Sequence, residues 1–332
     1  MIPLPCQAQS PMQLRQIGTT GILVTPVALG CWPIAGMTSP DVTHEQSLLT
    51  LHAAVDAGIN FLDTAYAYGT RGESECLIAE ALGDQREQLV IASKGGISLE
   101  TGGARNIDGR PGTLRAHCEA SLKRLQTDYL DLLYLHAPDP EVPVSESAGA
   151  LRALMEEGKT RSVGVSNFTL QQLIEFQQEC PISAFQPPYN MLQREIELDT
   201  LPWCQQNSVS VMIYWPLMKG LLAGKIGRDH VFTPGDSRLK YPMFQGEEWE
   251  KNQDLVDGLR QLGEQAGQSV AQLAVNWTLS QPGITSALCG AKRPEQIRET
   301  AGAMSQVMES ETLAAIDQLL AARGQPVTRA AV

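Results

Sequence analysis

Short apolar segments alternate with segments of helical periodicity along almost the whole of the 332-residue chain. The apolar segments are rich in valine, isoleucine and leucine, which is the composition of strands buried in a parallel sheet. Parallel strands need helical crossovers between them, so the alternation itself predicts an α/β fold. We predict eight strands, at residues 27–30, 59–62, 89–94, 129–136, 162–166, 182–186, 209–215 and 284–289.

The same periodicity predicts helices at residues 43–57, 73–82, 113–125, 144–157, 170–177, 201–206, 254–266, 270–280 and 294–303. Eight strand–helix units in roughly 300 residues fit a closed (β/α)8 TIM barrel better than an open doubly wound sheet. No G-x-G-x-x-G follows the first predicted strand, which further disfavours a Rossmann-type sheet.

We therefore predict one barrel domain over residues 12–323, with a β-hairpin from segments 12–17 and 22–29 and an appended helix at 311–322. Residues 1–11 are predicted to be a loose extension and residues 324–332 a tail. Two inserts, 95–112 and 218–250, are long for a barrel and rich in glycine or proline. Such loops are usually lids or binding loops.

The net charge and the cysteine pattern limit the classes of partner and the cellular location that we expect. A net charge of -12 argues against non-specific binding to nucleic acid or to an anionic membrane surface. No segment predicts a membrane span or a signal peptide, and the seven cysteines are scattered without a C-x-x-C pair. We therefore expect a cytoplasmic protein with a small-molecule substrate and no metal site. The pattern makes no prediction of oligomeric state.

Polar residues follow six consecutive predicted strands. Active sites of (β/α)8 barrels lie at the carboxyl ends of the strands. Each residue alone has a structural explanation: Asp63 or Asn167 could cap a helix, and Lys94 could be a solvated strand end. Their shared position at one rim favours a functional site instead, formed by Asp63, Lys94, His136, Ser166 with Asn167, Gln186 and Tyr214.

Four residues near this rim suit proton transfer to a carbonyl oxygen. Tyr68 follows Asp63 by five residues, and a tyrosine has an ordinary pKa of about 10. A nearby Lys94 ammonium is expected to lower that pKa, and Asp63 to anchor Lys94 by a charge-assisted hydrogen bond. His136 is expected to orient the carbonyl oxygen while a hydride moves.

The chain resembles the aldo-keto reductase superfamily from about residue 12 to residue 303, most closely its bacterial-type, potassium-channel-β-like and general-stress branches. The motifs that carry the resemblance are Asp63-Thr64-Ala65 with Tyr68-Gly69, Ser93-Lys94, Leu135-His136, Gly164-Val165-Ser166-Asn167-Phe168, Gln186, Tyr214 with Pro216-Leu217, and Gly220-Leu221-Leu222-Ala223-Gly224-Lys225. The resemblance implies a catalytic tetrad of Asp63, Tyr68, Lys94 and His136.

The resemblance also implies a nicotinamide cofactor. Ser166, Asn167 and Gln186 would hold its carboxamide, and Tyr214 would stack on its ring. The segment 216–225 would fold over the pyrophosphate, through Pro216, Leu217, Gly220, Leu222 and Lys225. The family pattern places the acid five residues after the aspartate, which selects Tyr68 rather than Tyr66. Tyr66 would then line the substrate pocket, together with Trp32. Trp215 replaces a residue that is usually small.

The turn after the last strand predicts the cofactor type. Gly290, Ala291, Lys292 and Arg293 precede a helix whose N-terminus favours anions. Two cations there suit a 2′-phosphate, so NADP(H) is preferred to NAD(H), although solvated surface cations remain the alternative. By resemblance Gln296 and Glu299 would face the adenosine, while Thr300 departs from the usual asparagine.

The resulting prediction is an NADPH-dependent oxidoreductase that reduces an aldehyde or ketone to an alcohol, with Tyr68 as general acid. Two alternatives stay open. One is a sugar or aldose dehydrogenase that uses NAD(P) in the oxidative direction. The other is a redox-sensing subunit that binds the cofactor and turns over slowly.

Overall fold

Eight parallel strands close into a barrel in the computed structural model, which describes residues 13–37, 41–100 and 104–327. Around the barrel the strands follow the order β10-β11-β12-β3-β4-β5-β8-β9, so neighbours in sequence are neighbours in space. The predicted (β/α)8 fold is confirmed. The barrel strands are β3 (Val27–Gly30), β4 (Phe61–Asp63), β5 (Val90–Gly95), β8 (Leu132–Leu135), β9 (Val163–Ser166), β10 (Ala184–Gln186), β11 (Ser210–Tyr214) and β12 (Ile284–Gly290).

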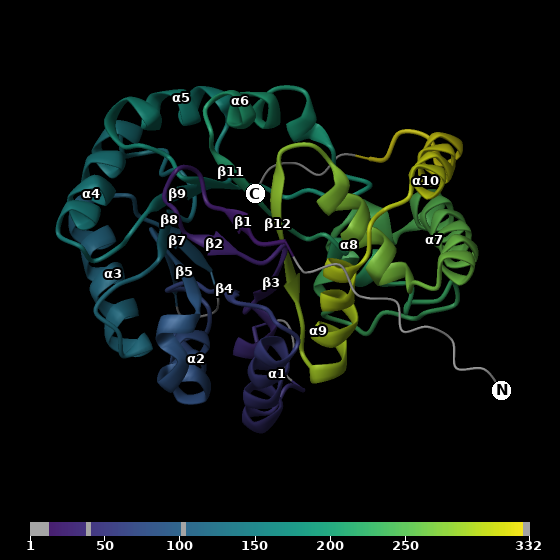
Figure 1. Ribbon diagram of the computed structural model, residues 1–332, viewed down its shortest axis with the longest axis horizontal. Helices are drawn as coiled ribbons and strands as arrows, with labels where there is room; N and C mark the ends of the chain where they lie inside the picture. The colour runs from purple at the N-terminus through teal and green to yellow at the C-terminus, as the bar shows by residue number, and fades with distance from the viewer. Residues whose placement is uncertain (1–12, 38–40, 101–103, 328–332) are drawn as a thin grey trace.

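Helices surround this barrel (Figure 1). Every predicted helix is present, although α7 begins eight residues before the predicted start, where two glutamates occupy its first turn. Helix α10 packs on α7 and is the predicted appended helix. The helices are α1 (His44–Asp56), α2 (Glu73–Leu82), α3 (Pro111–Leu125), α4 (Val144–Glu156), α5 (Leu170–Glu179), α6 (Thr200–Gln206), α7 (Gly246–Ala266), α8 (Val270–Ser280), α9 (Pro294–Ala301) and α10 (Ser310–Arg323).

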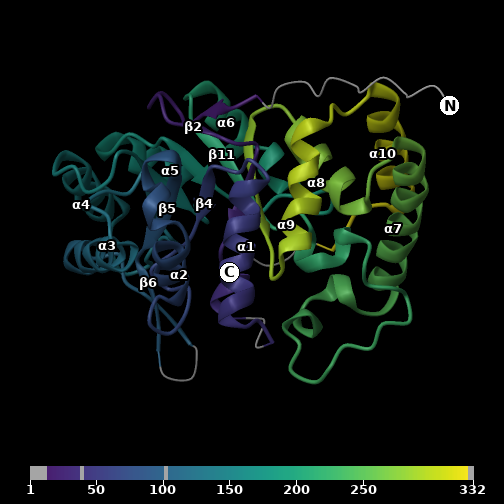
Figure 2. The same cartoon turned by 60° about the horizontal axis from the view of Figure 1, so that its bottom comes forward.

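Two hairpins lie at opposite ends of the barrel (Figure 2). The predicted N-terminal hairpin pairs β1 (Arg15–Gln16) with β2 (Leu23–Val24), and its Ile17 and Ile22 pack against the barrel interior. The second hairpin, β6 (Ile97–Leu99) with β7 (Arg105–Ile107), lies within the insert at 95–112. It projects from the same end as the loop after β11. The predictions for residues 1–12 and 328–332 fall outside the described residues.

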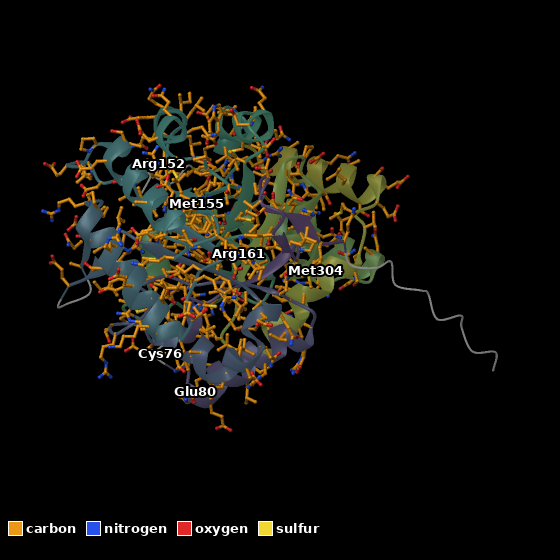
Figure 3. All side chains as sticks on the ribbon, turned by 60° about the vertical axis from the view of Figure 1, so that its left-hand side comes forward. Cys76, Glu80, Arg152, Met155, Arg161 and Met304 are labelled. Carbon is orange, nitrogen blue, oxygen red and sulfur yellow. The ribbon has the colours of Figure 1, made fainter. Side chains whose placement is uncertain are left out.

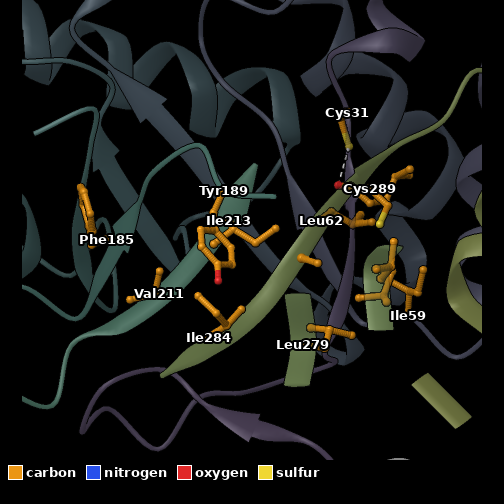
Figure 4. Close-up of a cluster of buried hydrophobic side chains, with 14 of the residues drawn as sticks. Cys31, Ile59, Leu62, Phe185, Tyr189, Val211, Ile213, Leu279, Ile284 and Cys289 are labelled. Carbon is orange, nitrogen blue, oxygen red and sulfur yellow. Dashed lines mark hydrogen bonds between the residues drawn. The ribbon is translucent and has the colours of Figure 1, made fainter. Parts of the chain in front are cut away.

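Strand periodicity separates an inner and an outer layer of side chains. Successive strand residues point to opposite faces of a sheet. Phe61, Val90 and Leu132 therefore fill the barrel interior, while Leu62 and Phe185 belong to the second cluster between strands and helices (Figure 4). None of the described helices is both long and apolar enough to span a membrane. This alternation decides which strand-end residues reach the barrel mouth.

Candidate active site

The predicted polar residues meet at the carboxyl ends of the strands because their side chains point into the barrel. The inward-pointing positions run from Phe61 to Asp63 in β4, and from Val90 through Ala92 to Lys94 in β5. The Lys94 ammonium donates to Asp63 Oδ1 at 2.6 Å, to the Thr64 carbonyl at 2.8 Å and to the Tyr68 hydroxyl at 3.3 Å. Lys94 and Asp63 are 1% and 3% exposed, so this group is shielded from solvent.

A tight loop after β4 places Tyr68 beside Lys94. The Tyr66 backbone N–H donates to the Lys94 carbonyl at 3.1 Å, and the Tyr68 N–H donates back to Ala65 at 3.0 Å. Gly69 then has φ 100°, and a Cβ there would lie 2.7 Å from the Glu73 nitrogen. Only glycine fits this conformation and this space. The turn therefore fixes the direction of the Tyr68 ring.

The charges at this site correct one sequence prediction. Burial raises the pKa of Tyr68, and this outweighs the opposing effect of Lys94. The expected lowering is therefore wrong in its net direction, because a sequence shows the nearby cation but not the extent of desolvation. Burial also disfavours the Lys94 ammonium, but Asp63 and Tyr68 together raise its pKa. Tyr68 is thus a protonated phenol beside a protonated amine at neutral pH.

His136 follows β8 and its ring lies near Tyr68. The two ring centroids are 6.0 Å apart in an edge-to-face arrangement. Among described residues, the buried Nδ1 of His136 has no hydrogen-bond partner. Burial, with Lys94 and Arg105, holds the pKa of His136 well below its ordinary value. The imidazole is therefore neutral, and it can hydrogen-bond to a ligand.

The next three strands supply a connected row of polar side chains. Ser166 Oγ donates to the Gln186 carbonyl at 2.8 Å, and the Asn167 amide donates to Ser166 Oγ and to the His136 carbonyl, both at 3.0 Å. The Tyr214 hydroxyl donates to Asn167 Oδ1 at 2.8 Å. Gln186 Nε2 donates to Asp63 Oδ2 at 2.8 Å, so this row joins the Lys94 group directly.

Backbone strain gathers where the resemblance places the cofactor. Six described non-glycine residues have positive φ, and four of them are Asn167, Trp215, Met218 and Lys219. Strained residues of this kind cluster at ligand sites. The Lys219 ammonium lies 4.6 Å from the Trp215 ring centroid and 4.7 Å from that of Tyr241. The Trp215 ring therefore stabilises the loop after β11 through its contacts with Lys219 and Tyr241.

This loop meets the last strand–helix turn. Lys225 Nζ, from the loop, lies 3.2 Å from Glu299 Oε1 on α9. Gln296 Oε1 accepts the backbone N–H of Lys292 at 2.8 Å, while Arg293 is exposed at the start of α9. The ion pair thus joins the loop after β11 to α9, while the other predicted residues of the two segments, Pro216, Leu217, Gly220, Leu222, Gly290 and Ala291, belong to the same stretches of chain. Thr300 is buried and bonds within its own helix.

Tyr66 and Trp32 have different surroundings from each other. The Trp32 ring stands edge-on to Tyr68, with centroids 5.0 Å apart, as a pocket wall would. The Tyr66 ring stacks on His117 at 3.7 Å, and the Arg124 guanidinium lies 4.4 Å from its centroid. Both partners belong to α3. These contacts give no support to the predicted pocket role of Tyr66, because its faces are occupied by this helix.

Sequence reasoning missed a buried ion pair behind the site. Glu75, on α2, is 0% exposed. It accepts from Ser93 Oγ at 2.7 Å and from Arg124 at 3.0 Å, and Arg124 also donates to the Tyr66 carbonyl at 3.1 Å. The Ser93 side chain points away from the barrel interior, next to the inward-pointing Lys94. This network therefore stabilises both β5 and the loop that carries Tyr68. A glutamate in a first helical turn gave no signal of this role.

The fold and this site define a (β/α)8 barrel oxidoreductase in which a buried lysine meets a partly buried tyrosine and histidine at the strand ends. The sequence profile of the aldo/keto reductase family matches residues 26–321. The chain belongs to this family, whose members carry out NAD(P)H-dependent carbonyl reduction, and the resemblance found from the sequence is confirmed.

Named relatives cover nearly the whole chain. It is 36% identical to aldo-keto reductase YhdN of Bacillus subtilis over 312 residues, which is 93% of this chain and 94% of the relative. It is 34% identical to the NADH-specific methylglyoxal reductase of Escherichia coli over 311 residues, 89% and 94% of the two chains. The solved structure of glycerol dehydrogenase AKR11B4 from Gluconobacter oxydans matches with a TM-score of 0.89 and 35% identity, covering 96% of this chain and 98% of the other.

Proposed function

We propose that the protein reduces aldehydes or ketones to alcohols with NADPH, and that Tyr68 donates the proton. The observation that carries this proposal is the buried Lys94 ammonium, which bonds to Asp63 at 2.6 Å and to the Tyr68 hydroxyl at 3.3 Å. Asp63 holds the ammonium in place. The ammonium then stabilises the phenolate that forms when Tyr68 gives up its proton.

The residues around Tyr68 divide the remaining work. A bound nicotinamide dinucleotide supplies the hydride when it occupies the site. Tyr68 transfers its proton to the carbonyl oxygen, and the phenolate recovers a proton from solvent afterwards. His136, kept neutral by burial, orients the carbonyl oxygen. Two alternatives, the oxidative sugar dehydrogenase and the slow redox-sensing subunit, use the same residues and differ in direction or rate.

Several features support a dinucleotide site next to Tyr68. Ser166, Asn167, Gln186 and Tyr214 present amide and hydroxyl groups at the mouth, suited to a carboxamide and an aromatic ring. The strained loop after β11 and the N-terminus of α9 suit the phosphates. Lys292 and Arg293 add positive charge there, which favours a 2′-phosphate and hence NADPH.

We also infer a cytoplasmic location. The six cysteines among the described residues are free, and five of them are buried. Figure 3 labels Cys76, the exposed one, on α2 beside Glu80. Burial raises the pKa of Cys180 to about 12, so that thiol stays protonated. Free thiols of this kind are typical of reducing compartments.

The proposal is tested by steady-state turnover of the purified protein. Oxidation of NADPH and of NADH is followed with a panel of small aldehydes and ketones, and reduction of NADP+ and NAD+ with sugars and polyols. We expect NADPH oxidation with an aldehyde to be faster than the reduction of NADP+ or NAD+ with any sugar or polyol. Cofactor binding without turnover in either direction would contradict the reductase and favour the sensing subunit.

A further inference from the structure

Arg105 brings a positive charge to the mouth of the barrel. It lies on β7, in the hairpin that projects from the strand ends at which the site lies (Figure 2). Its guanidinium carbon is 6.0 Å from the centroid of the Trp32 ring. Trp32 in turn stands 5.0 Å from the Tyr68 ring. The Trp32 ring therefore lies between Arg105 and the proposed proton donor, Tyr68, and contacts both.

This guanidinium has no protein counter-charge within the part of the chain that the structure describes. No carboxylate there lies within ion-pair distance of Arg105, whereas Arg110 in the same insert is held by both oxygens of Asp108, at 2.8 and 2.7 Å. The Arg105 side chain is exposed, so its donors are available to a ligand.

The contact with Trp32 leaves those donors open. A distance of 6.0 Å is the outer limit of a cation–π contact, so this contact is weak, and no residue that the structure describes accepts a hydrogen bond from the Arg105 guanidinium. The charge also reaches the reaction centre, because Arg105 contributes to the lowered pKa of His136. A guanidinium within such reach of a substrate site is suited to a carboxylate or a phosphate, because either anion can accept two parallel N–H hydrogen bonds from it.

We propose that Arg105 is a specificity residue that binds a carboxylate or phosphate on the carbonyl substrate, at the end remote from the reacting carbon. The inference rests on the proposed function of the site and names its preferred class of substrate. In a protein of net charge -12, most of the surface repels anions. A single cation at the mouth would both attract such a substrate and fix its orientation over Tyr68.

Matched substrate pairs test this proposal. Succinic semialdehyde is compared with butanal for the carboxylate, and glyceraldehyde 3-phosphate with glyceraldehyde for the phosphate. The ratio of kcat/KM for the charged member to that for its neutral partner should fall at least about tenfold in R105M, the loss of one charge-assisted contact. R105K should keep part of the preference, and the pair with the larger change identifies the anion.

The control removes a positive charge far from the mouth. Lys123 is exposed in the last turn of α3, at the helix end remote from the loop that follows β5. K123M changes the net charge as R105M does, and its ratios should match the wild type. Equal falls in K123M and R105M would show a general charge effect and overturn the proposal.

Binding gives a readout that does not need turnover. Calorimetry compares succinamate with the neutral succinamide on the protein saturated with NADP+. R105M should weaken succinamate at least about fivefold relative to succinamide. If no aldehyde is reduced, the proposed function fails while this measurement still decides the role of Arg105. Unchanged substrate ratios together with unchanged succinamate binding would overturn the inference.

Discussion

Replacing Arg124 with methionine should destabilise the protein strongly, because it strands a buried charge. The Glu75 carboxylate is 0% exposed, and its two oxygens are satisfied by Ser93 at 2.7 Å and Arg124 at 3.0 Å. Removing one partner of a buried ion pair typically costs about 3–5 kcal/mol. R124M also loses the donor that holds the Tyr66 carbonyl, so we expect a loss in this range.

The assay is urea unfolding followed by circular dichroism at pH 7. The double variant E75Q/R124M removes both charges and should recover at least about 1 kcal/mol of the loss in R124M, as expected for residues in contact. R115M, which breaks the solvent-exposed pair with Glu157, is the control and should leave the midpoint almost unchanged. A loss in R124M of less than about 1 kcal/mol would refute the reasoning, since it would place Glu75 in a solvated site.

The remaining predictions concern pH and cofactor choice. Burial lowers the pKa of His117 to about 4 from an ordinary 6.5, so the unfolded chain takes up this proton first as pH falls. Unfolding free energy should therefore drop by up to roughly 3 kcal/mol between pH 6.5 and 4, and H117Q should flatten this slope; parallel curves would contradict it. In K292A/R293A, titration of cofactor fluorescence should show NADPH binding about tenfold weaker and NADH binding little changed; equal losses would refute the 2′-phosphate assignment.

The barrel and the polar rim could be predicted because both follow from alternation. The strand–helix repeat identifies a parallel sheet, and the period of two in β4 and β5 carries Asp63 and Lys94 to the inner face. The rule extends to Ser166, Gln186 and Tyr214 on the following strands. These positions depend only on the order of residues along a strand, which the sequence contains.

The features that escaped prediction depend on three-dimensional proximity. Tyr66 and Tyr68 lie two residues apart, so strand alternation would point both rings to the same side. The turn at Ala65 and Gly69 instead directs the Tyr66 ring to α3 and the Tyr68 ring to Lys94. The raised pKa of Tyr68 depends on how far the hydroxyl is desolvated. Glu75 and Arg124 come from two helices, and neither residue departs from an ordinary helical pattern.

A single-turnover measurement of Y68F tests the central assignment most directly. The enzyme, saturated with the reduced cofactor, is mixed with an aldehyde at pH 7, and the decay of cofactor absorbance reports the hydride-transfer rate. Loss of a general acid typically costs 10²–10⁴-fold, so we expect Y68F to be at least about 100-fold slower while it still binds the cofactor. A rate within about threefold of the wild type would show that Tyr68 does not donate the proton.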